Sequence, residues 1–178
     1  MTIRHLLPVV AMTTVLAGGG PALAQSSAAQ TTSGALTLFM PLAVAKLSDL
    51  SFGTVMRPTS GGGNVSVNAT TGQVTAGGGA AVMSGGPGGA ASRAAFEVTG
   101  EGGLNFSVVV PQNFIMTRTG GQETLQVSLV STTGGGTLSG RNGSAGSAAF
   151  GIGGSTQLNS TTQGGTYTGT FTITVAYN

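Results

Sequence analysis

Few residues of this chain could do acid–base chemistry. The chain has one histidine and four carboxylates: His5, Asp49, Glu97, Glu101 and Glu123. Glu97 and Glu101 flank residues 99–100, so a tight turn could bring them together like the carboxylate pair of a glycosidase. Such pairs work in clefts with aromatic platforms for sugars, and this chain has no tryptophan and two tyrosines. Glu97 also alternates with apolar neighbours, which predicts that it points to solvent. We therefore interpret these carboxylates as solubilising charges.

The composition argues against catalysis and against metal chemistry. Without cysteine the chain can form no disulfide, no thiolate metal site and no cysteine nucleophile. No two carboxylates are spaced as in a calcium loop, and nothing pairs a nucleophile with a base. The net charge of +2 is too small for nucleic-acid binding, which needs clustered Lys and Arg. We expect no enzyme activity, no cofactor, no metal and no nucleic-acid partner.

The N-terminus has the pattern of an export signal. Arg4 supplies the positive charge, residues 6–16 are a short apolar stretch, and residues 22–24 supply the small residues of a cleavage site. This pattern predicts a signal peptide over residues 1–24, whose removal takes away His5. The apolar stretch is shorter than the roughly 20 residues that span a bilayer. We expect a protein exported to the periplasm, the cell surface or the medium, with no membrane insertion after cleavage.

The C-terminal segment predicts a strand. In residues 165–178 apolar or small residues alternate with threonine and alanine. Successive side chains of a strand point to opposite faces, so this segment has a buried apolar face and a threonine-covered solvent face. The apolar face ends with Phe171, Ile173, Val175 and Tyr177.

Weaker alternation upstream predicts further short strands. They lie at residues 36–44, 65–67, 73–75, 96–98, 104–110, 114–116, 125–129 and 148–152. Glycine-rich clusters between them predict turns at residues 61–64, 77–79, 120–121, 134–136 and 153–154. Residues 76–92, rich in Gly and Ala, predict a long flexible loop.

These elements predict an all-β protein: an antiparallel, immunoglobulin-like β-sandwich of about 7–9 short strands with Gly-rich turns. We expect residues 25–34 to be a flexible N-terminal segment and residues 35–178 to form a single domain. The core is predicted from its largest side chains, which are Phe52, Phe96, Phe106, Phe150, Phe171 and Ile173.

Two C-terminal features resemble the subunits of bacterial chaperone–usher pili. The chain ends in an alternating strand with Tyr177 next to last, and Gly165 lies fourteen positions from the end. The resemblance implies a sandwich that lacks one strand, which the N-terminal extension of the next subunit supplies. It also implies that the strand with Phe171, Ile173, Val175 and Tyr177 contacts other subunits or a periplasmic chaperone, which works with an usher. The physical basis is β-augmentation, in which an open edge offers main-chain hydrogen bonds.

A wider resemblance covers most of the chain after the leader. It consists of residues 41–42 (PL), 50–55 (LSFGTV) and 95–100 (AFEVTG) and the C-terminal run from residue 165 to residue 177. In this order and spacing the four pieces resemble a secreted bacterial family known as domain of unknown function 4402. The family name carries no activity, and its similarity to pilins and spore-coat-type fimbrial proteins implies a surface or filament role. Typical pilins often carry a disulfide, which this chain cannot form.

The first class of function that follows is a secreted structural or surface protein. It would be a fimbrial (pilus) subunit-like or adhesin-like domain that assembles into a homo-oligomer or filament by β-strand addition. Its donor strand would be the apolar alternation of Leu36, Leu38, Met40, Leu42 and Val44. The same alternation equally fits the first strand of a self-complete sandwich.

The second class is a self-complete monomeric binding module, secreted or periplasmic, for a carbohydrate or a protein ligand. A platform for a sugar would have to come from Tyr167, Tyr177 or the phenylalanines. Most of these residues lie on faces that we predict to be buried, so exposed stacking surface is scarce.

Overall fold

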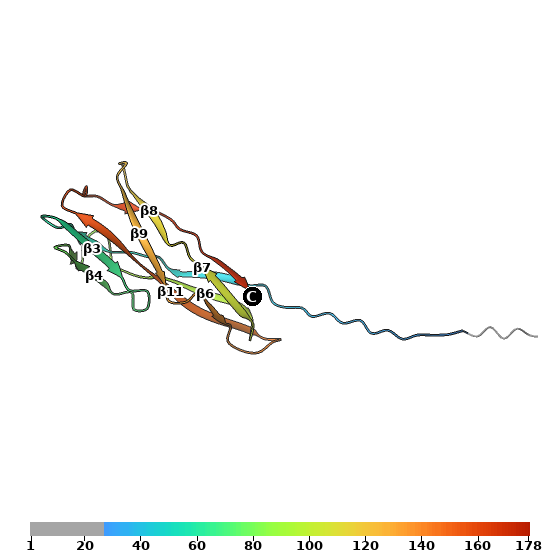
Figure 1. The fold of residues 1–178 in the computed structure, drawn as a ribbon. Coiled ribbons are helices and arrows are strands. Elements are labelled where there is room, and N and C mark those ends of the chain that lie inside the picture. The colour runs from blue at the N-terminus through green and yellow to red at the C-terminus, as the bar shows by residue number, and fades with distance from the viewer. Residues whose placement is uncertain (1–26) are drawn as a thin grey trace, which may run out of the picture. The chain divides into compact units, whose positions relative to one another are not determined.

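The computed structural model describes residues 27–178, and the predicted signal peptide over residues 1–24 lies outside them. In the described residues every regular element is a β-strand, and the paired strands run antiparallel (Figure 1). The predicted all-β antiparallel sandwich is therefore confirmed. Residues 37–178 form one compact unit, to which Leu36 does not belong. No helix within residues 27–178 is long and apolar enough to cross a membrane.

The largest sheet has eight strands and is built around β11. Its order is β1 (Ala43–Ser48), β6 (Ala94–Glu101), β11 (Ala145–Asn159), β9 (Thr124–Ser131), β8 (Asn113–Arg118) and β12 (Tyr167–Thr168). The hairpin of β3 (Gly62–Val67) and β4 (Val74–Gly77) belongs to the same sheet. One edge of β11 pairs first with β6 and then with β3, whereas the other edge pairs with β9. The length of β11, 15 residues, lets it hold these three neighbours together.

Two smaller sheets complete the fold. One contains β10 (Gly135–Thr137), β7 (Asn105–Val109) and β13 (Thr174–Tyr177), and the other pairs β2 (Thr54–Met56) with β5 (Ala81–Met83). The described residues thus contain 13 strands, more than the roughly 7–9 expected, because the C-terminal run forms two strands and because β2, β5 and β10 lie outside the predicted runs.

The prediction of one long loop over residues 76–92 is wrong. This segment contains the end of β4 and all of β5. Val82 of β5 lies directly opposite Val55 of β2, and a cross-strand pair of β-branched residues stabilises such a ladder. Because glycines flank this short apolar run on both sides, the sequence did not indicate a strand there.

The core lies between the eight-stranded and the three-stranded sheet. Its buried cluster consists of Ala94, Phe96, Val98, Phe106, Val108, Leu138, Phe150 and Ile152. The rings of Phe96 and Phe150 stack with centroids 5.4 Å apart. The prediction of the core is confirmed for Phe96, Phe106 and Phe150.

Phe171 and Ile173, also predicted for the core, are half-buried and pack against its cluster, whereas Phe52 is half-buried and does not belong to it. Phe171 and Ile173 belong to the C-terminal run, which keeps the predicted alternation but is not one strand. β12 pairs with β8 and β13 pairs with β7, so the run passes from one sheet to the other (Figure 1). Residues 169–173 between them lie outside any strand, because the run follows the border of the sandwich.

Gly153 and Gly154 lie inside β11, although we predicted a turn there. A Cβ at Gly153 would overlap the carbonyl oxygen of Val67 in β3, and a Cβ at Gly154 would come within 3.1 Å of the carbonyl oxygen of Ser128 in β9. Both neighbours of β11 thus approach the backbone closely at this point. These two glycines let the neighbouring strands β3 and β9 pack closely against β11, and they do not form a turn.

The first strand begins later than predicted. β1 starts at Ala43, so Leu36, Leu38, Met40 and Leu42 lie outside any strand. Of the predicted set, Val44 alone lies in a described strand. The cause is local, because Pro41 has no N–H for a ladder and Glu101 accepts the hydrogen bond of the Met40 N–H.

Candidate strand-addition site

The core is uncovered along β1. Val44 of β1 lies directly opposite Val98 of β6, and directly opposite residues of an antiparallel pair point to the same face. Val98 is fully buried, whereas Val44 is 43% exposed. Val44 therefore faces the core, but no further strand covers it, because β1 is the last strand of its sheet.

The core is uncovered in the same way along the C-terminal run. Val175 and Tyr177 of β13 lie opposite Val108 and Phe106 of β7, which are both buried. Val175 and Tyr177 are only half-buried, although they face the same side. β13 is the last strand of its own sheet.

The free edge of β13 offers main-chain hydrogen bonds. The Asn178 N–H donates to the carbonyl oxygen of Asn105 on the β7 side. Hydrogen-bonded and non-bonded pairs alternate along an antiparallel ladder. The N–H groups of Val175 and Tyr177 therefore point away from β7, toward the open edge. We call the exposed core faces of β1 and of residues 171–177 the open border.

Tyr177 joins the two sides of the open border at one end. Its hydroxyl donates to the carbonyl oxygen of Met40 at 2.9 Å and accepts from the N–H of Glu101 at 2.7 Å. The Glu101 carboxylate accepts from the N–H of Met40 at 3.1 Å and from the N–H of Gly143. This junction fixes the residue from which the N-terminal segment departs.

The junction corrects our interpretation of Glu101 as a solubilising charge. Glu101 is 3% exposed, and main-chain N–H groups satisfy its carboxylate. Room for this arrangement comes from Gly100, where a Cβ would overlap the Tyr177 hydroxyl and lie 3.1 Å from a methyl group of Leu42. The glycines on both sides of Glu101 were the signal in the sequence that could have indicated a crowded site.

The predicted donor residues are exposed. Leu36 and Leu38 are 82% and 79% exposed, and Met40 is 39% exposed. Residues 27–42 belong to no strand. The structure thus places Met40 and Leu42 at the junction and Val44 on the open border, and it leaves Leu36 and Leu38 without apolar cover.

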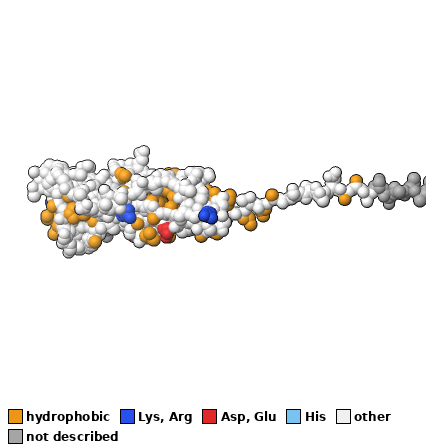
Figure 2. Space-filling view, turned by 90° about the horizontal axis from the view of Figure 1, so that it is seen from below, with side chains coloured by type: hydrophobic (Ala, Val, Ile, Leu, Met, Phe, Trp, Pro, Cys, Tyr) orange, Lys and Arg blue, Asp and Glu red, His pale blue; other side chains and the backbone are white. Residues whose placement is uncertain are grey.

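A charged pair limits the open border at its far end. Lys46 lies opposite the buried Phe96, and its ammonium group lies 2.6 Å from the Asp49 carboxylate. Inward-pointing charges on edge strands discourage indiscriminate pairing. The face drawn in Figure 2 has few charged side chains and several patches of exposed apolar ones. Within residues 27–178 no group of three or more acidic or histidine side chains could hold a metal ion.

Fold and border together define an antiparallel β-sandwich whose core is open along two edge strands. The chain belongs to the family described as domain of unknown function DUF4402, whose model matches residues 42–177. This match confirms the family that the sequence motifs resemble, whereas the likeness to pilins stays a prediction. The comparison with curated proteins and the comparison with solved structures found no match.

Proposed function

We propose that this protein is an exported structural subunit or adhesin-like domain of a surface filament and that it assembles by β-strand addition. In this proposal the N-terminal apolar segment of one copy covers the open border of another copy. The product is a homo-oligomer or filament. The observation that carries the proposal is the exposure of Val44, which faces the core directly opposite the fully buried Val98.

The donor segment matches what the open border needs. Leu36, Leu38 and Met40 alternate with other residues, so in an extended chain they lie on one face. Each aliphatic side chain that leaves water contributes about 1.5–3 kcal/mol before the cost of ordering the chain. The N–H groups at the edge of β13 supply the main-chain hydrogen bonds of an added strand.

The open border also calls for protection before assembly. Unpaired strand edges beside exposed apolar surface favour aggregation. A periplasmic chaperone that pairs with the C-terminal strand through Phe171, Ile173, Val175 and Tyr177, and an usher that passes the subunit on, would supply this protection. These partners are part of the proposal.

A peptide experiment tests the proposal. The purified protein is refolded with and without a synthetic peptide of residues 31–42, and its oligomeric state is measured by size-exclusion chromatography with light scattering. We expect assembly of the protein alone and its suppression by excess peptide, because peptide and donor segment compete for one border. In the full chain, the double substitution Leu36→Asp and Leu38→Asp should abolish assembly.

The matched control is Thr37→Asp, which adds a charge to the opposite face of the same segment and should leave assembly intact. A protein that stays monomeric at every concentration and ignores the peptide has a self-complete sandwich, and that result would overturn the proposal. Equal effects of the control and of the double substitution would count against it too, because they would reflect charge alone.

A further inference from the structure

A second region of interest lies where β9 and β11 separate. Their pairing ends at Val127 and Thr156. Beyond this point β9 continues to Thr124 beside β8, and β11 continues to Asn159 beside β3. Within residues 27–178, the facing main-chain edges of residues 124–126 and 157–159 are therefore not paired with each other. The Thr156 hydroxyl donates to the carbonyl oxygen of Gln126 at 2.8 Å, near the point of separation.

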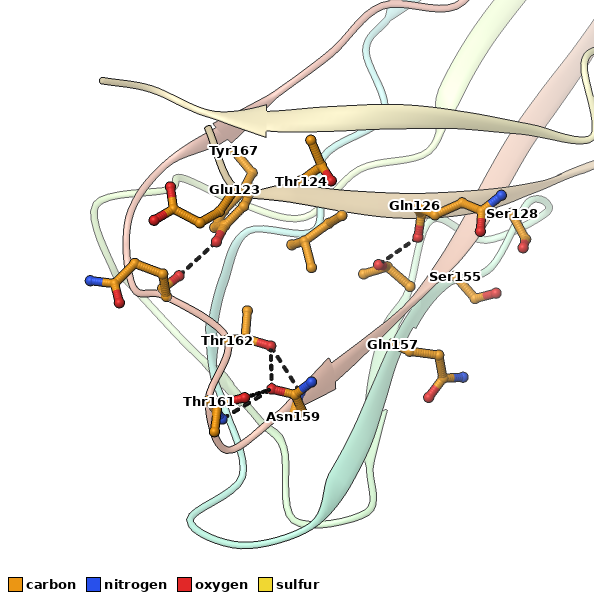
Figure 3. A pocket seen from close by; sticks show the side chains of 13 residues that line it. Glu123, Thr124, Gln126, Ser128, Ser155, Gln157, Asn159, Thr161, Thr162 and Tyr167 are labelled. Carbon is orange, nitrogen blue, oxygen red and sulfur yellow. Dashed lines mark hydrogen bonds between the residues drawn. The ribbon is translucent and has the colours of Figure 1, made fainter. Parts of the chain in front are cut away.

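A cleft of about 580 Å³ occupies this separation (Figure 3). Such a volume lies in the range of roughly 300–1,000 Å³ that is typical of small-molecule sites. β9 contributes Gln126 and Ser128, β11 contributes Ser155, Gln157 and Asn159, and β12 contributes Tyr167. Small-molecule sites are mostly apolar, so this polar lining indicates an unusually polar ligand.

The lining can both donate and accept hydrogen bonds. Among the side chains drawn in Figure 3, no hydrogen bond engages the amides of Gln126 and Gln157. Asn159 Oδ1 accepts from the main chain of Thr161 at 3.0 Å and from the Thr162 hydroxyl at 3.1 Å, which leaves its NH₂ group as a donor. Amides and hydroxyls offer donors and acceptors side by side, and so do the hydroxyl groups of a sugar.

The charges around the cleft favour a neutral ligand. Glu123 is the charged residue among those that line the cleft. Arg118 donates to its two oxygens from Nε at 2.7 Å and from the guanidinium NH₂ at 3.2 Å. The Glu123 carboxylate is thus already paired, and the lining contains no Lys or Arg side chain that could bind an anionic group. No charged side chain of the lining is free to pair with an acidic or a basic ligand, and Arg57, which donates to the carbonyl oxygen of Thr162 at 2.6 Å, lies outside the lining.

We propose that this cleft binds a neutral oligosaccharide. Tyr167 provides the aromatic surface, and its ring is held because its hydroxyl donates to the carbonyl oxygen of Gln163 at 2.8 Å. Gln126, Gln157 and Asn159 provide the hydrogen bonds. An extended peptide fits less well, because strand addition gains specificity from apolar pockets for alternate side chains, whereas amides and hydroxyls dominate this lining. The inference concerns residues apart from the open border and does not depend on the proposed function.

Nuclear magnetic resonance titration of the purified protein tests the inference. The probes are cellotetraose, maltotetraose and chitotetraose as neutral oligosaccharides, with tetragalacturonate as the acidic comparison. We expect at least one neutral probe to shift the resonances of Gln126, Gln157 and Asn159. Replacing Gln157 with Ala should weaken that binding about threefold to tenfold, which corresponds to the loss of one hydrogen bond.

The matched control is Gln73→Ala, which removes an exposed amide beyond the cleft and should leave affinity unchanged. The variant Tyr167→Phe keeps the ring and should retain most of the affinity. The inference is overturned if none of the neutral probes binds more tightly than about 1 mM. It is overturned as well if the shifts map elsewhere, if the acidic probe binds better, or if Gln73→Ala weakens binding as much as Gln157→Ala.

Discussion

Among the places in residues 27–178 where strand pairing stops, two expose opposite chemistry. At the open border the end of pairing leaves inward-facing aliphatic groups such as those of Val44 and Val175 in contact with water. Between β9 and β11 it leaves polar groups such as the amides of Gln126 and Gln157. An uncovered apolar face gains free energy when another apolar segment covers it. An uncovered polar face needs water or a polar ligand instead.

The difference follows from where each region lies in the sandwich. The open border lies at the margin of the core, and its inward-facing side chains are apolar except Lys46 at its far end. The cleft opens where one sheet divides, and the outward-facing side chains of β9 and β11 there are polar. One fold can thus offer a place for assembly and a place for a ligand without any overlap of residues.

The largest predicted effect compares the covered core with the open border. Replacing Phe150 with Ala should lower the free energy of unfolding by about 3–5 kcal/mol, because its buried ring would leave a cavity. Replacing Phe171 with Ala should cost only about 1–2 kcal/mol, because this ring is half-buried and packs on Phe114 at 5.1 Å. Urea unfolding measures both losses. Equal losses would mean that the border is covered in the folded monomer.

The junction should give the next largest effect. Gly100→Ala should lower the free energy of unfolding by about 2 kcal/mol, because the new methyl group overlaps the Tyr177 hydroxyl. Tyr177→Phe should cost about 1–2 kcal/mol through the loss of two hydrogen bonds. The double variant should lose less than the sum, because Phe lacks the oxygen that the methyl group meets. Strict additivity in a double-mutant cycle would show that the two residues do not meet.

Val44 and Val98 lie opposite each other, so the loss of stability on truncating each one can be compared within one cross-strand pair. Val98→Ala should cost about 2 kcal/mol, since the side chain is fully buried. Val44→Ala should cost less than about 1 kcal/mol in the monomer, since the side chain is already partly in water. Thermal and urea unfolding of the two variants at low protein concentration test this. A larger loss for Val44→Ala than for Val98→Ala would reverse our assignment of the border.

The smallest effect concerns pH at the rim of the cleft. The hydrogen bonds from Arg118 lower the pKa of Glu123 below its usual range. A lowered pKa in the folded state means that the ion pair adds stability above the ordinary carboxyl pKa and loses it as the pH falls through the lowered value. The pair is exposed, so the contribution is small. Melting temperatures of the protein and of Glu123→Gln should differ slightly at neutral pH and converge in acid; a constant difference would contradict this.

The sequence predicted strands well because alternation is a local property. It could not predict which inward-facing residues are covered, because coverage depends on partners far along the chain. Val44 and Val98 occupy equivalent inward positions in their strands. Val44 is the one at an edge, because β1 pairs with β6 only, whereas β6 pairs with β1 and β11. Glu101 shows the same limit, since its contacts at the junction come from Met40 and Tyr177, 61 and 76 residues away.

The cleft could not be predicted from the sequence for a similar reason. Tyr167 was predicted on a buried face, and it does alternate as expected. Tyr167 and Gln157 line the same cleft because β9 follows β8 while β11 follows β3. No pattern within one strand reports where two strands separate.

Amide hydrogen exchange at the edge of β13 tests the central claim most directly. The N–H groups of Val175 and Tyr177 are followed in the free protein and in the presence of the peptide of residues 31–42. We predict that their exchange slows by roughly tenfold or more when the peptide binds, because an added strand accepts their hydrogen bonds. Exchange that stays unchanged at saturating peptide would contradict strand addition at this border.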